Sequence, residues 1–270
     1  MRIPRAACIN DLSGFGRCSL TTAIAVLSAS GVQACPVPTA VLSKHTGFKD
    51  FFFRDLTDSM NDYMDNWNDI EFDGIYSGFL GSAEQIQAVE KFIKKHGSCS
   101  VVVDPVMGDG GKLYATYTKQ MQEEMKRLAD CADILTPNIT EMCFLTDSEY
   151  CGEDITPEQA IELMKKLRQR TNAKIVLTGI ARENKMINMT YDSSGINMSE
   201  VQRENKVFSG TGDIFSSIVC AFTLKGKSLH EAVNIAGKFI SSSIERTVSS
   251  ETSLTEGVIF EPLLYKLGQI

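Results

Sequence analysis

The sequence lacks the features that mark several large classes of protein. No stretch approaches the roughly 18 consecutive apolar residues of a membrane span, so the sequence predicts no membrane-spanning helix. Lys and Arg form no run longer than a pair, and the formal net charge is −7, so there is no electrostatic footprint for nucleic acid. An anionic ligand must therefore be held locally, by backbone amides and a metal ion.

Paired cysteines are also missing. None of the eight cysteines belongs to a Cys-x-x-Cys pair, and several lie within apolar runs, where free cysteine behaves as a small hydrophobic residue. A disulfide framework is not expected in a chain that is long enough to have a core of its own. Residues 1–5 lack the long apolar core of a signal peptide. We therefore expect buried, reduced thiols in a cytoplasmic protein.

Two nucleotide-binding motifs are absent or incomplete. The Walker A pattern Gly-x-x-x-x-Gly-Lys-Ser/Thr does not occur, which disfavours a P-loop kinase. Gly14-Phe15-Gly16 begins the dinucleotide pattern Gly-x-Gly-x-x-Gly, but Ser19 stands where the third glycine is needed. A lone Gly-x-Gly is weak evidence, so we do not favour a dinucleotide-binding protein.

The chain does contain a regular alternation of apolar runs and amphipathic segments. The apolar runs that predict buried strands are Ala6–Ile9, Gly74–Ser77, Ser100–Asp104, Asp133–Thr136 and Lys174–Thr178. Stripes with helical spacing lie at residues 20–27, 56–67, 86–93 and 161–167. This alternation predicts an α/β fold, with a largely parallel sheet covered by helices on both faces. We expect a single domain over residues 1–270.

The last quarter of the chain has a different pattern. Met186–Tyr191 and Ile196–Val201 flank a short polar turn, which predicts a hairpin at the edge of the sheet. Three helices are expected after it, over about residues 213–225, 228–247 and 258–267.

Small, acidic and polar residues follow the predicted strands. In an open parallel sheet, ligands bind beyond the carboxyl ends of the strands, so these segments predict one shared site. They are Asn10–Gly16, Ser77–Ser82, Asp104–Gly111, Thr136–Glu141 and Thr178–Gly179. Asp104, Asp109 and Glu141 offer the oxygen ligands that Mg²⁺ takes, although each alone is also typical of a turn or a helix cap.

The most informative segment is Ser209-Gly210-Thr211-Gly212-Asp213. Two glycines allow a tight turn that presents successive N–H groups to an oxyanion, and the helix that follows adds the positive end of its dipole. This arrangement stabilises the charge of a phosphoryl group in transfer. Asp213 has two interpretations, either an N-cap or a base that accepts a hydroxyl proton. The acidic strand ends favour the base.

His45-Thr46-Gly47 follows the strand-like stretch Pro38–Leu42. His45 could be a ligand or a base. A single histidine without a partner at metal-binding spacing is more often a hydrogen-bonded structural residue, which is our expectation.

Five segments together resemble the pyridoxal kinases of the ribokinase superfamily, in particular the bacterial pyridoxamine/pyridoxal kinase type. They are Asn10–Gly16, His45–Gly47, Asp104–Asp109, Thr136–Asn138 with Glu141, and Gly210–Asp213. The resemblance covers essentially the whole chain. It implies a ribokinase-like three-layer α/β/α fold with a mainly parallel central sheet, no separate lid domain, and usually a homodimer.

The resemblance also implies a role for individual residues. Asp213 would be the base that activates the 5′-hydroxymethyl oxygen of the substrate, and Gly210, Thr211 and Gly212 would form the anion hole. The residues implied for ATP and Mg²⁺ are Asp104, Asn138 and Glu141, with Thr178, Gly210 and Gly212 also at ATP. Thr136 and Thr178 would line a region for a monovalent cation such as K⁺ and for phosphate. Asp11, Thr46 and Phe79 would face the pyridine ring, and Tyr114 would lie in a loop near ATP and the substrate.

The resemblance implies ATP-dependent phosphorylation of pyridoxal, pyridoxamine or pyridoxine. Asp11 replaces a serine of the animal members and Phe79 a tyrosine of many members, which bears on the preferred vitamer. Hydroxymethylpyrimidine kinases are the nearest alternative, but many of them carry cysteine where this chain has Asp213. A sugar kinase and a non-catalytic pyridoxal-phosphate binding protein are further alternatives; the intact Gly210–Asp213 segment argues against the latter.

Overall fold

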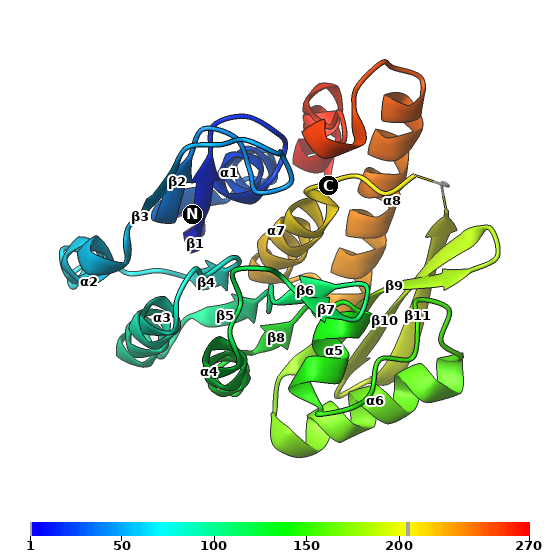
Figure 1. Ribbon diagram of the computed structural model, residues 1–270, viewed down its shortest axis with the longest axis horizontal. Helices are drawn as coiled ribbons and strands as arrows, with labels where there is room; N and C mark the ends of the chain where they lie inside the picture. The colour runs from blue at the N-terminus through cyan, green and yellow to red at the C-terminus, as the bar shows by residue number, and fades with distance from the viewer. Residues whose placement is uncertain (1, 204–205) are drawn as a thin grey trace.

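A nine-stranded sheet forms the centre of the computed structural model, which describes residues 2–203 and 206–270 (Figure 1). The strands lie in the order β11 (Gly195–Gln202), β10 (Lys185–Asp192), β9 (Lys174–Arg182), β8 (Ile134–Leu135), β5 (Ser100–Val103), β4 (Gly74–Ser77), β1 (Arg5–Ser13), β2 (Gln33–Leu42) and β3 (Phe53–Asp55). Neighbouring strands from β9 through β2 are parallel. Antiparallel pairs lie at the two edges, where the hairpin β10–β11 and the short β3 are added.

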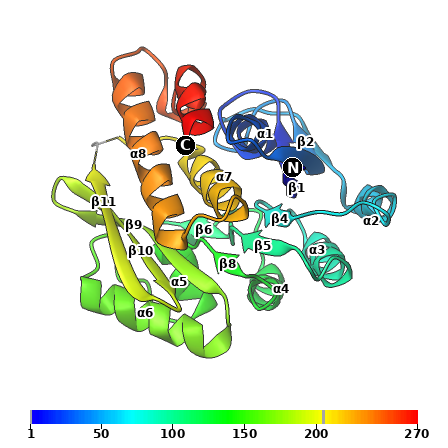
Figure 2. The same ribbon diagram turned by 180° about the vertical axis from the view of Figure 1, so that it is seen from behind.

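Helices cover both faces of this sheet (Figures 1 and 2). One face carries α1 (Ser19–Ala29), α7 (Thr211–Leu224), α8 (Leu229–Val248) and a C-terminal 3₁₀ helix (Glu261–Gln269). The other carries α2 (Thr57–Asp65), α3 (Ala83–Lys95), α4 (Lys119–Ala129), α5 (Ile139–Leu145) and α6 (Pro157–Arg170). A separate two-stranded hairpin, β6 (Gly108–Asp109) and β7 (Lys112–Leu113), lies beside the start of α5.

Each face of the sheet has its own apolar core. Successive side chains of a strand point to opposite faces, and β5 shows the consequence. Val101 and Val103 pack in the core under α3 and α4, whereas Val102 packs in the core under α7 and α8. Burial on both faces explains why the central strands are continuous apolar runs in the sequence, as parallel sheets require.

The predicted three-layer architecture and the edge hairpin are confirmed. The predicted helix over residues 258–267 is wrong in type, because the segment Glu261–Gln269 forms a 3₁₀ helix with Pro262 in its first turn. The predicted strand Asp133–Thr136 shortens to β8, with only Ile134 and Leu135 paired. Among the described residues, no helix combines the length and the apolar character needed to cross a membrane.

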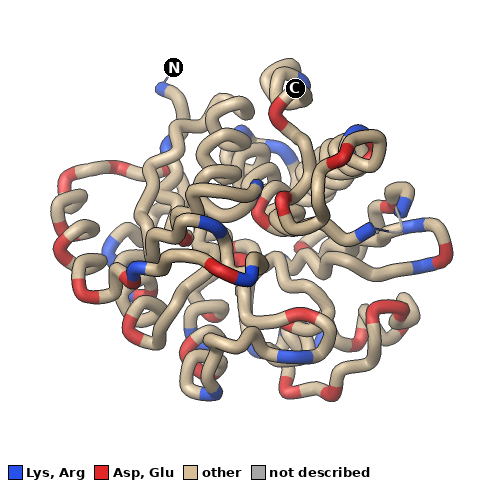
Figure 3. Tube along the Cα trace, turned by 45° about the horizontal axis from the view of Figure 1, so that its top comes forward, with Lys and Arg blue, Asp and Glu red and all other residues tan. Residues whose placement is uncertain are grey.

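Charged residues of both signs are interspersed along the trace (Figure 3). Positive charge near a bound anion therefore has to come from helix ends and backbone amides at one place, in line with the sequence prediction.

Candidate active site

The carboxyl ends of the parallel strands bring together most of the polar residues predicted from the sequence. Asn10 and Asp11 lie near the end of β1, Asp104 follows β5, and Thr136 follows β8. All four are buried, Asp104 with 7% of its surface exposed. Ser216, on α7, donates from Oγ to Asp104 Oδ2 at 3.1 Å. The structure thus gathers these strand ends against the first turns of α7.

Asp213 is the third residue of α7 and not its N-cap. The N-cap is Gly210, which has φ of 78° and makes no side-chain capping bond. The Asp213 carboxylate instead accepts a hydrogen bond at Oδ1 from Asn10 Nδ2, at 3.1 Å. The N-cap interpretation of Asp213 is therefore wrong, and its carboxylate faces the end of β1.

The Gly210 turn presents free backbone donors. Ile214 is the residue whose N–H first reaches a carbonyl of this helix, at Gly210 O and 3.1 Å. The N–H groups of residues 211–213 precede it and have no intrahelical acceptor, as at the start of every α-helix. A Cβ added to Gly210 would lie 1.7 Å from the Arg17 carbonyl oxygen, so only glycine fits. These residues have the arrangement expected of an anion hole.

Four carboxyl groups at these strand ends have raised pKa values, and burial is the first cause for Asp11 as for the other three. Burial raises the pKa of Asp213 to about 6, although the Ser19 backbone N–H and the Asn10 amide favour its ionised form. Burial and then the charge of Asp213 raise the pKa of Asp104 to about 7. Burial and then the charge of Asp104 raise the pKa of Glu141. Several buried acids in mutual repulsion are typical of a site that receives a cation.

The protein ligands alone do not complete a metal site. In the part of the chain that the structure describes, no three Asp, Glu, His or Cys side chains are grouped so that they could hold an ion. Mg²⁺ in proteins usually keeps several waters and binds one or two carboxylates together with phosphate oxygens. The buried carboxylate of Asp104, with Thr136 and Ser216 beside it, fits that mode of binding.

Asn138 and Glu141 form the capping box of α5. Asn138 Oδ1 accepts from Glu141 N, and Glu141 Oε2 accepts from Asn138 N, both at 2.9 Å. Asn138 Nδ2 also donates to Gly108 O at 3.0 Å, and Glu141 Oε1 accepts from Met107 N at 3.1 Å. Both side chains therefore fix the β6–β7 hairpin beside the site. Thr178 lies alongside, donating from Oγ1 to Pro137 O at 3.3 Å.

The residues predicted to face the substrate ring differ in exposure. Asp11 is buried and accepts from Ser13 Oγ at 2.7 Å, and Phe79 is half-buried. Thr46 is exposed. Tyr114 exposes 42% of its surface, but burial of its hydroxyl and then the charge of Glu141 raise its pKa. Its phenol therefore lies towards the acidic residues at the strand ends, such as Glu141 and Asp104.

His45 has the structural role expected from the sequence. Its Nδ1 accepts from Gly47 N at 3.1 Å, so Nε2 carries the proton and donates to Thr255 O at 2.7 Å. The ring thereby fastens the loop after β2 to the C-terminal segment.

Two residues of the site were not predicted from the sequence. Asn10 was part of a quoted segment but had no role of its own, and Ser216 was not singled out. The spacing of three residues from Asp213 places Ser216 near the same face of α7, and this signal could have identified it.

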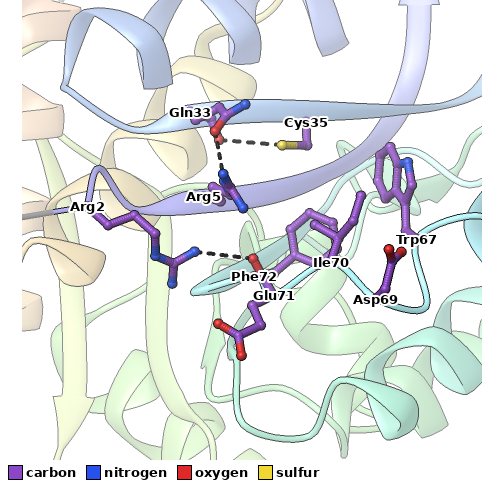
Figure 4. Close-up of a pocket in the computed structure, with 9 residues that line it drawn as sticks. All are labelled: Arg2, Arg5, Gln33, Cys35, Trp67, Asp69, Ile70, Glu71 and Phe72. Atoms are coloured by element: carbon purple, nitrogen blue, oxygen red, sulfur yellow. Dashed lines mark hydrogen bonds between the residues drawn. The ribbon is translucent and has the colours of Figure 1, made fainter.

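A separate cavity of about 530 Å³ lies at the other end of the strands, beside the starts of β1 and β2 (Figure 4). Arg2 and Arg5 line it from the start of β1, and Trp67 and Phe72 line it from the segment before β4. It is remote from the strand ends that carry Asp11 and Asp104, so it is not the candidate site.

Comparison with known proteins points to one family. The profile of the family described as phosphomethylpyrimidine kinase matches residues 18–257. A pyridoxine kinase from Bacillus subtilis is 29% identical over 181 residues, covering 66% of this chain and 66% of that protein. A hydroxymethylpyrimidine/phosphomethylpyrimidine kinase from Staphylococcus aureus is 28% identical over 225 residues, covering 80% of this chain and 79% of that protein.

A solved structure is more similar still. It is a Bacteroides thetaiotaomicron protein whose assignment as a phosphomethylpyrimidine kinase is provisional, crystallised with pyridoxal. It is 36% identical to this chain, with a TM-score of 0.94, and the match covers 98% of this chain and 96% of that one. The resemblance drawn from the sequence motifs is thereby confirmed at the level of family and fold.

Proposed function

The chain is a kinase that belongs to the phosphomethylpyrimidine kinase family, and we propose that its phosphoryl acceptor is the 5′-hydroxymethyl group of pyridoxal, pyridoxamine or pyridoxine. The donor in this proposal is ATP. The observation that carries it is the Asp213 carboxylate in the first turn of α7, directly after the glycine turn that offers free N–H groups. Base and anion hole are thus adjacent in the chain and share one helix end.

In this reaction Asp213 accepts the proton of the attacking hydroxyl group. With a pKa of about 6 it is mostly ionised at neutral pH, yet basic enough to take a proton. The amides of residues 210–212 hold the oxygens of the transferred phosphoryl group, where negative charge is greatest. Mg²⁺, when bound, neutralises charge on the triphosphate, and Asp104, Thr136, Asn138 and Glu141 would hold it directly or through water.

Two relatives support a vitamin B6 acceptor, namely the Bacteroides protein crystallised with pyridoxal and the Bacillus subtilis pyridoxine kinase. The second candidate acceptor is hydroxymethylpyrimidine, which the family profile and the Staphylococcus aureus relative favour. Both acceptors are flat heteroaromatic alcohols, and a hydrophobic pocket discriminates such analogues by only roughly 10- to 200-fold. The acceptor must therefore be decided by measurement.

Asp213→Asn tests the catalytic role. Asparagine is nearly isosteric but cannot act as a base, so kcat should fall roughly 10²- to 10⁴-fold while the Kd for nucleotide stays nearly constant. Nucleotide binding measured by calorimetry serves as the control for folding. Undiminished turnover would contradict the assignment of Asp213 as the base.

The acceptor is tested by ADP release with pyridoxal, pyridoxamine, pyridoxine and hydroxymethylpyrimidine side by side. We expect the largest kcat/KM for one of the three vitamers. A larger value for hydroxymethylpyrimidine would transfer the proposal to the pyrimidine. Absence of ADP with all four alcohols would favour a binding protein without kinase activity.

A further inference from the structure

Asn10 lies at an irregular point of the central sheet. The register between β1 and β2 shifts beside Asn10, because Asn10 pairs with Pro38 and Leu12 with Val41, which marks a bulge in the facing strand β2. Bulges re-aim side chains and recur beside active sites. Here the completely buried Asn10 amide points to the start of α7, where it meets Asp213.

The orientation of this amide is fixed from two sides. Asn10 Oδ1 accepts from the backbone N–H groups of Asp11 and Phe79, both at 2.9 Å. An oxygen that accepts two N–H donors leaves the NH₂ group at the other position of the amide. Nδ2 therefore faces Asp213 Oδ1, at 3.1 Å. The Asn10 amide has space here because residue 78 is glycine; a Cβ added to Gly78 would lie 2.3 Å from Nδ2.

We propose that Asn10 is the positioning residue for the base, fixing the orientation of the Asp213 carboxylate and stabilising its ionised form through one hydrogen bond. This inference rests on the proposed phosphoryl transfer. It also connects three parts of the site, because the same amide holds the backbone of Asp11 and Phe79, the two buried or half-buried residues implied to face the ring.

The charge around Asp213 explains why a neutral donor matters there. Among the described residues, the ionisable groups whose charge acts on Asp213 or responds to it are all acidic: Asp11 of β1, Cys18 before α1, Tyr76 of β4, Asp104 after β5 and Tyr114 after β7. None of them offsets its negative charge. Burial and then the charge of Asp11 raise the pKa of Asp213, and the Ser19 N–H and the Asn10 amide oppose that rise. Loss of the amide should therefore raise the pKa further.

The test is Asn10→Leu, which removes the donor, fills a similar volume and admits no water. The acid limb of the pH–kcat profile should move up by roughly 1–2 pH units, since a hydrogen bond to a charged group is lost. At pH 6, kcat should fall roughly 5- to 50-fold and recover towards the wild-type value near pH 9.

Asn188→Leu is the matched control. Asn188 of β10 is also buried, and its Oδ1 also accepts a backbone N–H, from Gly179 at 3.2 Å. Both variants should lose stability, but only Asn10→Leu should shift the acid limb. If Asn10→Leu does not fold, Asn10→Ser carries the same expectation, because its shorter side chain does not reach Asp213.

An unchanged acid limb, or an equal loss of kcat at every pH, would overturn the inference and leave Asn10 with a structural role only. Asp213→Asn separates the two hypotheses. If that variant loses turnover while the Asn10 profile does not shift, the base assignment stands and the positioning role fails. If Asp213→Asn keeps full turnover, the base assignment fails and the positioning role fails with it; the proposed function itself fails only if the wild type releases no ADP with any of the four alcohols.

Discussion

At the scale of single residues, the candidate site depends on one position that only glycine can fill. Gly210 combines φ of 78° with a close approach to the carbonyl of Arg17, in the loop before α1. The turn and the α1 loop are therefore in contact through main-chain atoms. Any side chain at position 210 would separate them and displace the N–H groups of the following residues.

We predict that Gly210→Ala destabilises the protein by about 3 kcal/mol or more and abolishes most turnover. Gly226→Ala is the matched control. Gly226 has φ of 85°, but an added Cβ would meet no atom within 4 Å. It should lose only the roughly 1–2 kcal/mol of left-handed strain and keep its kcat. Denaturant unfolding and steady-state kinetics check both variants; equal losses of stability would show that the contact with Arg17 is unimportant.

The site residues that could be identified from the sequence are those whose place in the fold follows from their position relative to predicted strands and helices. Asp104 follows a strand and Asp213 lies in the first turn of a helix, so topology alone brings both to the carboxyl ends of the parallel strands. The role of Asn10 depends on a bulge and on the space above Gly78, and neither has a local sequence signature. The direction of a single buried amide could therefore be found only from the coordinates.

At the scale of elements, the helices differ in how their first turns are satisfied. Capping boxes begin α5, α6 and α8, and serine or threonine side chains cap α3 and α4. The helices α1, α2 and α7 begin without a side-chain capping bond, and of these α1 and α7 start beside Asp213. Their free N–H groups are thus available to a ligand and to the base, which a capped helix would not allow.

The capping box of α5 allows a second comparison. Asn138→Ala should cost about 1 kcal/mol of stability, as is usual for an N-cap. Ser228→Ala, in the exposed capping box of α8, should cost about the same. Only Asn138→Ala also removes a hydrogen bond to the β6–β7 hairpin, from Nδ2 to Gly108 O, so only this variant should raise KM for ATP or lower kcat. Equal kinetics in both variants would restrict Asn138 to a cap.

The elements themselves were predictable where burial left a periodic pattern. The central strands and the stripes of α1, α3 and α6 were identified because their apolar spacing is regular. The predicted stretch Pro38–Leu42 missed the first half of β2, which begins at Gln33 and contains Pro36 and Pro38. Both prolines are tolerated because β3 pairs only with residues 40–42, which leaves that side of β2 open. β3 is a three-residue exposed edge, too short for a signal.

At the scale of the whole molecule, the alternation of strands and helices predicted the layers but not the order of the strands. Placing β8 between β5 and β9, and β1 between β4 and β2, depends on how the two cores pack. Sequence periodicity says which faces are buried and not which strands are neighbours. The order matters because it places Asp11, Asp104 and Asp213 around one point, and their repulsion acts on the stability of the whole fold.

Asp104 should therefore make the free energy of unfolding depend on pH. Its pKa is about 7 in the folded protein and about 3.9 in an unfolded chain, so the folded state binds more protons between these values. Stability consequently falls as pH rises through this window. In Asp104→Asn the carboxylate is absent, while an oxygen remains to accept from Ser216. This variant should be more stable than the wild type at pH 8, by on the order of 3 kcal/mol.

Urea unfolding of both ligand-free proteins from pH 4 to pH 8 measures the difference. At pH 4 the two should be nearly equal, because the wild-type carboxyl is then largely protonated when folded and only about half ionised when unfolded. The gap should widen steadily up to pH 7 and then level off. A constant gap, or a less stable variant at pH 8, would mean that Asp104 is already paired with positive charge. The case for a cation-binding site at the end of β5 would then lose its electrostatic basis.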